Sequence, residues 1–319
     1  MSDCHRTICQ ISEQIDHYVV GQPHVTRAML IALLTGGHVL IEGLPGTAKT
    51  RAVKVMSQLM GLSFARVQFT PDLLPADITG SQIYQHETSE LNFQPGPIFH
   101  SMILADEINR APAKVQAALL EGMAEGTVST SGTTMPLPQP FMVLATQNPV
   151  EQEGTYPLPE AQLDRFVIKV TVDYPELEHE KQIIRLMRQE DRQSQSSQDL
   201  GAVPDASLAL ERAKQAVLHV HVAESMEQYM ADLVVATRTS PKFTQWIEVG
   251  ASPRASIALD RCSRAQAWLE GRDFVMPDDI RTVATSVLAH RITLTFDALS
   301  EGITSQDVIE DLLLHIPFS

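Results

Sequence analysis

The chain has 319 residues, of which 44% are hydrophobic and 20% are charged, a composition typical of a globular protein long enough for two domains. Its formal net charge of −15 disfavours a general affinity for nucleic acid or for anionic membranes, because both would repel the protein's average field. The first residues lack the pattern of a secretory leader, the longest apolar runs are only strand-sized, and three cysteines are too few for a disulfide framework. These features predict a cytoplasmic protein without a membrane span.

The first half of the chain alternates short apolar runs, rich in β-branched residues, with helix-like segments. This alternation predicts βαβ units, a parallel sheet covered by helices on both faces, and an active site beyond the carboxyl ends of the strands. The predicted strands cover residues 39–41, 65–69, 102–105, 141–145 and 166–172, and the helices between them include 50–60 and 114–121.

The second half shows mainly helical periodicity, which predicts an all-helical second domain. The predicted helices cover residues 176–189, 205–217, 224–238, 254–270 and 277–288. A polar stretch near residues 189–199 contains few apolar residues and is typical of a linker. We therefore predict an α/β core over residues 1–190, a linker over 191–204 and a helical lid over 205–319.

The segment Gly43-Leu44-Pro45-Gly46-Thr47-Ala48-Lys49-Thr50 follows an apolar strand and begins a helix. In this context a P-loop presents backbone N–H groups to phosphates at a helix N-terminus. Lys49 would neutralise the β- and γ-phosphates of ATP, and the Thr50 hydroxyl would ligate Mg²⁺. Ala48 departs from the strict pattern, which has glycine at this position, so a simple turn with an incidental lysine is the alternative.

Two carboxylates follow the apolar strand of residues 102–105. Asp106 is predicted to bind the water shell of Mg²⁺, and Glu107 to orient and deprotonate the attacking water. A strand that ends in a solvated acidic turn is the alternative, but the P-loop upstream favours the catalytic interpretation.

A third strand, near residues 141–146, leads into Gln147-Asn148-Pro149. The Asn148 amide would lie between the ends of the other two strands, within reach of the γ-phosphate or the lytic water. Turn initiation by Asn-Pro is the alternative.

These motifs together make the chain resemble the MoxR family of AAA+ ATPases over nearly its full length. The resemblance rests on five segments: Gly43 to Thr50, Leu104 to Ala111, Ala145 to Pro149, Glu160 to Phe166 and Gly250 to Ala255. Alanine before the P-loop lysine is usual in that family, so Ala48 fits the resemblance.

The resemblance implies further roles. Asn148 corresponds to sensor 1, Arg165 to the arginine finger that reaches a neighbouring subunit's γ-phosphate, and Arg254 to sensor 2. A guanidinium can fork onto phosphate oxygens as charge develops, which suits both arginines, although each could instead form a structural salt bridge. An arginine that works in trans implies a homo-oligomeric ring, with six subunits in this family. Val20-Gly21-Gln22 resembles the segment whose backbone groups contact the adenine.

Two segments, 77–99 and 126–140, resemble the helix-2 insert and the pre-sensor-1 hairpin of this AAA+ clade, which face a ring's pore or a partner. Neither contains Lys or Arg, which disfavours DNA translocation and predicts no nucleic-acid partner. Gln68, at the end of the second strand, would couple partner binding to Glu107.

The implied function is an ATP-binding and ATP-hydrolysing ring, with ATP/ADP and Mg²⁺ as cofactors, that remodels or activates protein clients in the manner of a chaperone. Such clients include proteins with a von Willebrand factor A domain. A motor subunit like that of magnesium chelatase, and an ATP-gated scaffold with little hydrolysis, are the alternatives. Glu107 disfavours the scaffold, which needs no catalytic base.

Two groups of possible metal ligands are not interpreted as sites. His219 and His221 are too few, and Cys4, His5 and Cys9 lie in what the sequence suggests is a frayed N-terminus.

Overall fold

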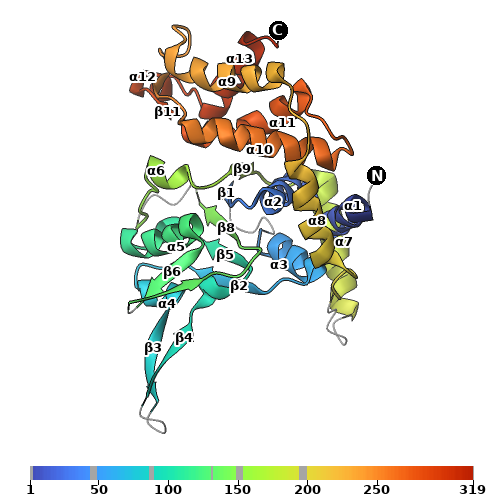
Figure 1. Ribbon diagram of the computed structural model, residues 1–319, viewed down its shortest axis with the longest axis vertical. Coiled ribbons are helices and arrows are strands. Elements are labelled where there is room, and N and C mark those ends of the chain that lie inside the picture. Colours follow the sequence, from blue (N-terminus) through green and yellow to red (C-terminus); the bar gives the residue numbers. More distant parts are fainter. Residues whose placement is uncertain are drawn as a thin grey trace.

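The computed structural model describes residues 3–43, 49–85, 90–130, 132–148, 154–193 and 200–318 (Figure 1). Four residues predicted to bind nucleotide, Pro45, Gly46, Thr47 and Ala48, lie outside the described residues.

A five-stranded parallel sheet forms the centre of the core domain. Its spatial order is β2 (Phe64–Gln68), β5 (Met102–Asp106), β8 (Met142–Gln147), β1 (Val39–Gly43) and β9 (Ile168–Val172). The predicted strands are therefore present. The carboxyl ends of β1, β5 and β8 are neighbours because β8 lies between the other two.

Both faces of the sheet are buried. Successive residues along a strand point to opposite faces, and in β1, β5 and β8 nearly all of them are buried. Val39 and Ile41 of β1 belong to a core cluster that includes residues of α1, α2, α3 and the lid, whereas Leu40 belongs to a second cluster with residues of α5. In Figure 1, α2 and α3 accordingly cover one face of the sheet and α4 and α5 the other. The predicted arrangement of helices on both faces is confirmed.

The helices of the core are α1 (Asp3–Tyr18), α2 (Pro23–Thr35), α3 (Lys49–Met60), α4 (Pro75–Thr79), α5 (Ala113–Glu125), α6 (Glu160–Leu163) and α7 (Leu177–Gln193), with short 3₁₀ turns η1 (Pro97–Phe99) and η2 (Ile108–Arg110). The helices after them are α8 (Ala206–Leu218), α9 (Glu224–Thr239), α10 (Pro253–Leu269), α11 (Pro277–Leu288), α12 (Phe296–Ser300) and α13 (Ser305–His315), with the 3₁₀ turn η3 (Ala289–Arg291). The lid formed by α9 to α13 lies at one end of the core in Figure 1.

Three antiparallel ribbons are added to this framework. The pair β3 (Gly80–Gln85) and β4 (Glu90–Pro95) forms a hairpin that extends away from the body of the protein (Figure 1). The pair β6 (Thr127–Thr130) and β7 (Thr133–Pro136) forms a second hairpin. The pair β10 (Ile247–Val249) and β11 (Thr293–Leu294) joins distant parts of the lid, which the helical pattern of the sequence did not predict.

The expectation of a frayed N-terminus was wrong. Residues 3–18 form the regular helix α1, whose residues Ile8, Ile11 and Ile15 are completely buried. Their spacing places them on one helical face, which packs against α3 and α8. His5 is also buried, with its ring edge-on to Trp268 of the lid, so this part of the chain has a packing role.

Within the described residues, no helix is long and apolar enough to cross a bilayer. The same residues contain no group of three or more His, Cys, Asp or Glu side chains suited to holding a metal ion. The three cysteines are free thiols, as expected.

His38 makes the stability of the core depend on pH. The ring is buried, contacts the Met123 carbonyl oxygen through Nε2 at 3.2 Å, and accepts the Val143 N–H at Nδ1 at 3.1 Å. Burial lowers its pKa from 6.5 to about 4. The unfolded chain therefore binds a proton between these two values that the folded chain does not, so stability is fully present above pH 6.5 and is lost as the pH falls towards 4.

We expect His38 to account for roughly 2 kcal/mol less stability at pH 5 than at pH 7, from the linkage relation for this shift. Urea unfolding at the two pH values would measure the difference, with His38→Gln as the comparison. A pH dependence of the same size in His38→Gln would contradict the assignment.

Candidate active site

Lys49 begins α3 at the carboxyl end of β1. Its Nζ donates a hydrogen bond of 2.7 Å to the carbonyl oxygen of Gly43, on the other side of the predicted phosphate loop. Burial lowers the pKa of Lys49, while Asp106 and Glu107 oppose that shift. Gly43 itself packs against β9, where a Cβ would lie 2.6 Å from the Val172 carbonyl oxygen, so only glycine fits there. Thr50 follows Lys49 in the first turn of α3.

Asp106 is the last residue of β5 and is held from both neighbouring strands. Thr146 of β8 donates from its hydroxyl to Oδ1 at 2.7 Å. Arg66 of β2 pairs with Oδ2 at 2.7 Å. The carboxylate is therefore fixed at the carboxyl end of β5, and its negative charge opposes the lowering of the Lys49 pKa by burial.

Glu107 has a left-handed backbone conformation, with φ of 56°. For a residue other than glycine this conformation costs on the order of 1 kcal/mol or more, and such strain is concentrated at functional sites. The conformation is stabilised by the Thr146 hydroxyl, which accepts the Glu107 N–H at 2.8 Å. The Thr146 hydroxyl thus orders both acidic residues, because it contacts the Asp106 carboxylate and the Glu107 backbone.

The Glu107 carboxylate is engaged by two donors. Gln68 Nε2 donates to Oε2 at 2.7 Å, and Arg110 Nη1 contacts the same oxygen at 2.9 Å. Arg66 also donates to Gln68 Oε1 at 3.0 Å, so it connects Asp106 to Glu107 through the glutamine. In this structure both carboxylates are therefore occupied by basic or amide groups of the chain itself.

We expect Arg66 to compete with metal for Asp106. The Arg66 side chain is 49% exposed, so solvent screening limits the pair to about 1 kcal/mol, and Arg66→Ala should strengthen Mg²⁺-dependent ATP binding by up to about fivefold. Titrating Mg²⁺ against a fixed concentration of ATP would measure this effect. Arg110→Ala is the matched control, because Arg110 contacts Glu107 rather than Asp106. An equal gain in both variants, or weaker binding in Arg66→Ala, would count against the competition.

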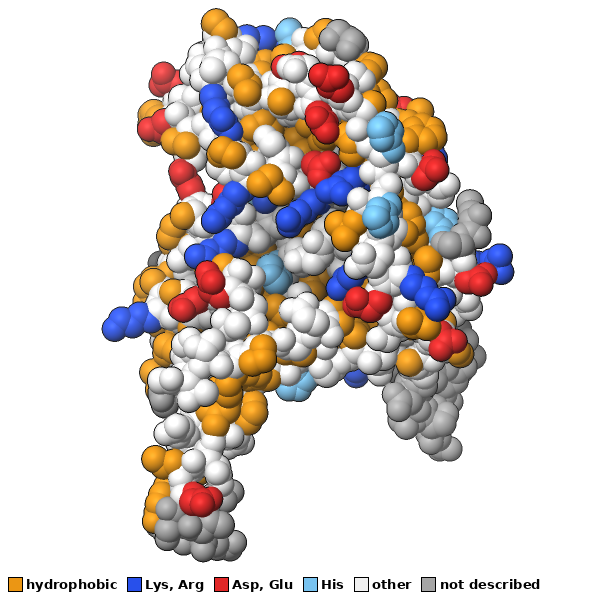
Figure 2. All heavy atoms as spheres, viewed as in Figure 1, with side chains coloured by type: hydrophobic (Ala, Val, Ile, Leu, Met, Phe, Trp, Pro, Cys, Tyr) orange, Lys and Arg blue, Asp and Glu red, His pale blue; other side chains and the backbone are white. Residues whose placement is uncertain are grey.

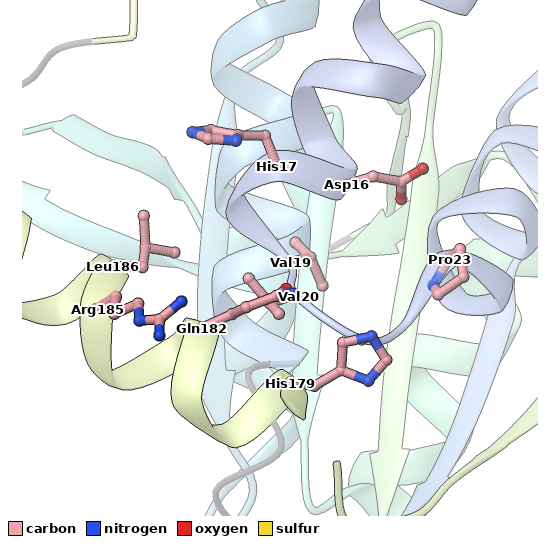
Figure 3. Close-up of a pocket in the computed structure, with 10 residues that line it drawn as sticks. Asp16, His17, Val19, Val20, Pro23, His179, Gln182, Arg185 and Leu186 are labelled. Carbon is pink, nitrogen blue, oxygen red and sulfur yellow. The ribbon is translucent and has the colours of Figure 1, made fainter. Parts of the chain in front are cut away.

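A cavity of about 600 Å³ lies between the α1–α2 turn and α7 (Figure 3). Val20 and Gly21 line it, and His179 and Gln182 of α7 border the same space. Gly21 has φ of +82°, and a Cβ there would lie 2.9 Å from His179 Cγ, so the turn approaches α7 closely. The cavity lies near the start of α3, because Arg51 donates to Met187 of α7 and stacks over the Tyr18 ring.

A second cleft, of about 400 Å³, lies where the lid meets the core. Arg165, Arg254, Arg261 and Arg291 line it, and Asp164 is the only acidic residue among the described residues of the lining. Figure 2 shows Lys and Arg side chains gathered along the boundary between lid and core. This local cluster of positive charge contrasts with the net charge of −15 of the whole chain.

The two groups of predicted residues lie at opposite ends of the sheet's strands. Asp106 ends β5, while Lys49, Glu107 and Asn148 follow the carboxyl ends of β1, β5 and β8, and Asn148 is buried. The arginine cleft is instead lined by residues 35–38, which precede β1, and by Val167, which precedes β9. Arg165 and Arg254 therefore lie together, at the end of β1 opposite to the one that Lys49 follows, and the strand between the two ends is roughly 15 Å long.

Sequence reasoning missed four residues that shape the two sites: Arg66, Arg110, Thr146 and Asp164. A usable signal existed for Thr146, because the parallel register pairs Ala105 with Ala145 and so puts Thr146 beside Asp106. Arg110 contacts Glu107 only three residues away, whereas Arg66 and Asp164 depend on contacts between segments that the sequence does not place together.

A parallel P-loop-type sheet with acidic strand ends and a helical lid defines the AAA+ class. The family profile described as "ATPase family associated with various cellular activities (AAA)" matches residues 38–168, and the AAA lid domain profile matches residues 243–312. A solved structure from Cytophaga hutchinsonii superposes with a TM-score of 0.90 at 42% identity, over 99% of this chain and 96% of that one.

Named relatives specify the family. Chaperone MoxR1 of Mycobacterium tuberculosis is 44% identical over 94% of this chain and 79% of its own length. Protein MoxR of Paracoccus denitrificans is 32% identical over 92% of this chain and 91% of its own length. The magnesium-chelatase 38 kDa subunit of Acidiphilium rubrum is 26% identical, with 91% of this chain covered and 93% of its own. The chain belongs to the MoxR family of AAA+ ATPases, which confirms the resemblance in its sequence.

Proposed function

We propose that this protein binds and hydrolyses ATP in a homo-oligomeric ring and uses the cycle to remodel or activate protein partners. The observation that carries the proposal is the convergence of Lys49, Asp106 and Glu107 at the carboxyl edge of the sheet, with a buried Asn148 after the intervening strand. A lysine, a metal-binding carboxylate and a base on neighbouring strand ends are the parts that phosphoryl transfer to water requires.

The nucleotide would extend from the cavity beside Val20 and Gly21 to the start of α3. The cavity is large enough for a purine, and the turn offers backbone groups for its edge. Gly43, Pro45, Gly46, Thr47 and Ala48 would surround the phosphates, as the family's P-loop pattern implies.

The cation site would be made by oxygen donors. The Thr50 hydroxyl and the Asp106 carboxylate suit Mg²⁺, which usually binds to one or two protein groups plus phosphates and water. When bound, Mg²⁺ neutralises charge on the β- and γ-phosphate oxygens. The chain's own contribution is to hold Asp106 in place through Thr146 and to supply the positive charge of Lys49.

Glu107 would take the proton of the attacking water, with the Asn148 amide orienting that water or the γ-phosphate. In this structure Gln68 and Arg110 hold the Glu107 carboxylate, so the base must be released from them before it can act. Gln68 would thereby serve as the switch that links partner binding to hydrolysis.

Arg165 and Arg254 would act on the nucleotide of a neighbouring subunit. Their shared position at the far edge of the sheet, about a strand length from the chain's own site, supports action in trans for both of them. A ring, with six subunits as in the family, brings the arginine cleft of one subunit to the phosphates of the next. Two guanidiniums there would stabilise charge in the transition state.

The cellular role would be chaperone-like, in the cytoplasm, on clients that include proteins with a von Willebrand factor A domain. The name of the MoxR1 relative supports the chaperone part of this proposal. The β3–β4 hairpin, which exposes Ile83, Tyr84 and Leu91, offers an apolar contact surface for such a protein. A motor subunit like that of magnesium chelatase is the second candidate, favoured only by the more distant relatives.

The direct test is phosphate release from ATP and Mg²⁺ by the purified chain. We expect turnover by the wild type, and loss of both ATP binding and turnover in Lys49→Ala, because the phosphates lose their main positive charge. Equal activity of the two proteins would indicate a contaminating ATPase. ATP binding without turnover by the wild type would support the scaffold alternative.

A further inference from the structure

We propose that Asp164 is a positioning residue that fixes Arg165 of the core and Arg254 of the lid as one unit facing the neighbouring subunit's nucleotide. The inference rests on the proposed function in trans of those two arginines. It adds a residue whose side chain contacts Arg291, Ser252 and Arg254 of the lid, and it explains why the arginines come from different domains yet share one cleft.

Both carboxylate oxygens of Asp164 accept hydrogen bonds from lid residues. Oδ1 accepts from Arg291 Nε at 2.7 Å, and Oδ2 accepts from the Ser252 hydroxyl at 2.9 Å. Arg254 Nη1 lies 3.9 Å from Oδ2. One carboxylate in the core therefore lies between two lid guanidiniums and the residue that caps α10.

Arg291 fixes the backbone on both sides of Arg165, since its Nη2 also donates to the Asp164 carbonyl oxygen at 3.4 Å. Its side chain is 3% exposed, and its Nη atoms donate to the carbonyl oxygens of Phe166 at 2.8 Å and Val167 at 3.2 Å. Because Arg291 is oriented by Asp164, the segment that carries Arg165 cannot move independently of the lid. The Arg165 side chain also donates to the Leu120 carbonyl oxygen of α5.

Arg254 lies at the N-terminus of a helix, where a nearby carboxylate stabilises its positive charge. It lies in the first turn of α10, directly after the N-cap Ser252 and Pro253. The positive end of a helix dipole disfavours a cation there and favours an anion. Asp164 offsets that repulsion in the isolated subunit, and 65% of the Arg254 side chain remains exposed. The arginine is thus held near the cleft while still available to a phosphate from outside.

Mixed rings can distinguish positioning from simple loss of structure. The variant is Asp164→Asn, which keeps the shape and an acceptor oxygen but removes the charge. We expect at least a tenfold fall in ATP turnover, with unchanged affinity for ATP at the variant's own phosphate loop. Mixed with Lys49→Ala subunits, which carry intact arginines, Asp164→Asn should recover activity; mixed with Arg165→Ala subunits, it should not.

The matched control is Glu160→Gln, four residues earlier. Glu160 also accepts a hydrogen bond from the lid, from the Thr293 hydroxyl, but it contacts none of the cleft arginines in the contacts described. It should retain wild-type turnover. Ser252→Ala removes a donor to Asp164 from the lid side, and its complementation pattern should match that of Asp164→Asn.

Wild-type turnover in Asp164→Asn, recovery with Arg165→Ala subunits, or recovery with neither partner would overturn the inference. A complementation pattern in Ser252→Ala that differs from the one expected for Asp164→Asn would also overturn it. This second variant keeps the test decisive if Asp164→Asn fails to fold. The mixture of Arg165→Ala with Lys49→Ala serves as the reference. If that reference shows no recovery, the trans function fails and this inference fails with it. If the reference recovers and the Asp164→Asn mixture does not, only the inference fails.

Discussion

Glu107→Gln should bind ATP as tightly as the wild type and hydrolyse it more slowly by a factor on the order of 10² or more. The amide has nearly the same shape as the carboxylate, but it cannot take a proton from water. The local structure should survive, because the Thr146 hydroxyl contacts the backbone of residue 107 and not its side chain. Phosphate release under saturating ATP, together with an equilibrium binding measurement, separates the two effects.

Gln68→Ala provides the comparison for that variant. It removes the amide that holds Glu107 at 2.7 Å but leaves the base in place, so its turnover should not fall with that of Glu107→Gln. Wild-type turnover in Glu107→Gln would reject Glu107 as the base. Loss of ATP binding in the same variant would show that residue 107 supports the site in another way.

Mixing Arg165→Ala with Lys49→Ala subunits should restore ATP hydrolysis that neither variant has alone. In such a ring, an Arg165→Ala subunit keeps its phosphate loop and can receive the arginine of a Lys49→Ala neighbour. Random mixing at equal amounts gives this pairing at about a quarter of the interfaces, which sets the expected activity relative to the wild type. The expectation rests on the proposed trans action, which is supported by the position of the cleft before β1 and of Lys49 after it.

Arg254→Ala should behave like Arg165→Ala in this assay: it should recover hydrolysis when mixed with Lys49→Ala subunits and not when mixed with Arg165→Ala subunits. If it instead recovers with Arg165→Ala subunits and not with Lys49→Ala subunits, Arg254 acts in its own subunit. Absence of recovery in every mixture, with rings shown to form by sedimentation, would contradict the trans assignment of both arginines.

The sequence alone determined the features that depend on local order. The strand that ends at Gly43, the helix that begins at Lys49 and the acidic strand end at Asp106 and Glu107 are encoded in contiguous residues, since apolar periodicity and glycine placement act over short distances. The rule that parallel strands bring their carboxyl ends together then placed Asn148 correctly between β1 and β5. The family resemblance rested on these segments together with Glu160 to Phe166 and Gly250 to Ala255.

Only the tertiary structure decided how distant segments meet. The sheet order β2-β5-β8-β1-β9 aligns Arg66 and Gln68 with the two carboxylates, although about 40 residues separate them in sequence, as is usual for parallel pairing. The docking of the lid likewise put Arg254 beside Arg165 rather than beside Lys49, through Asp164 and Arg291. Periodicity cannot predict such contacts, because they depend on the packing of whole faces between domains.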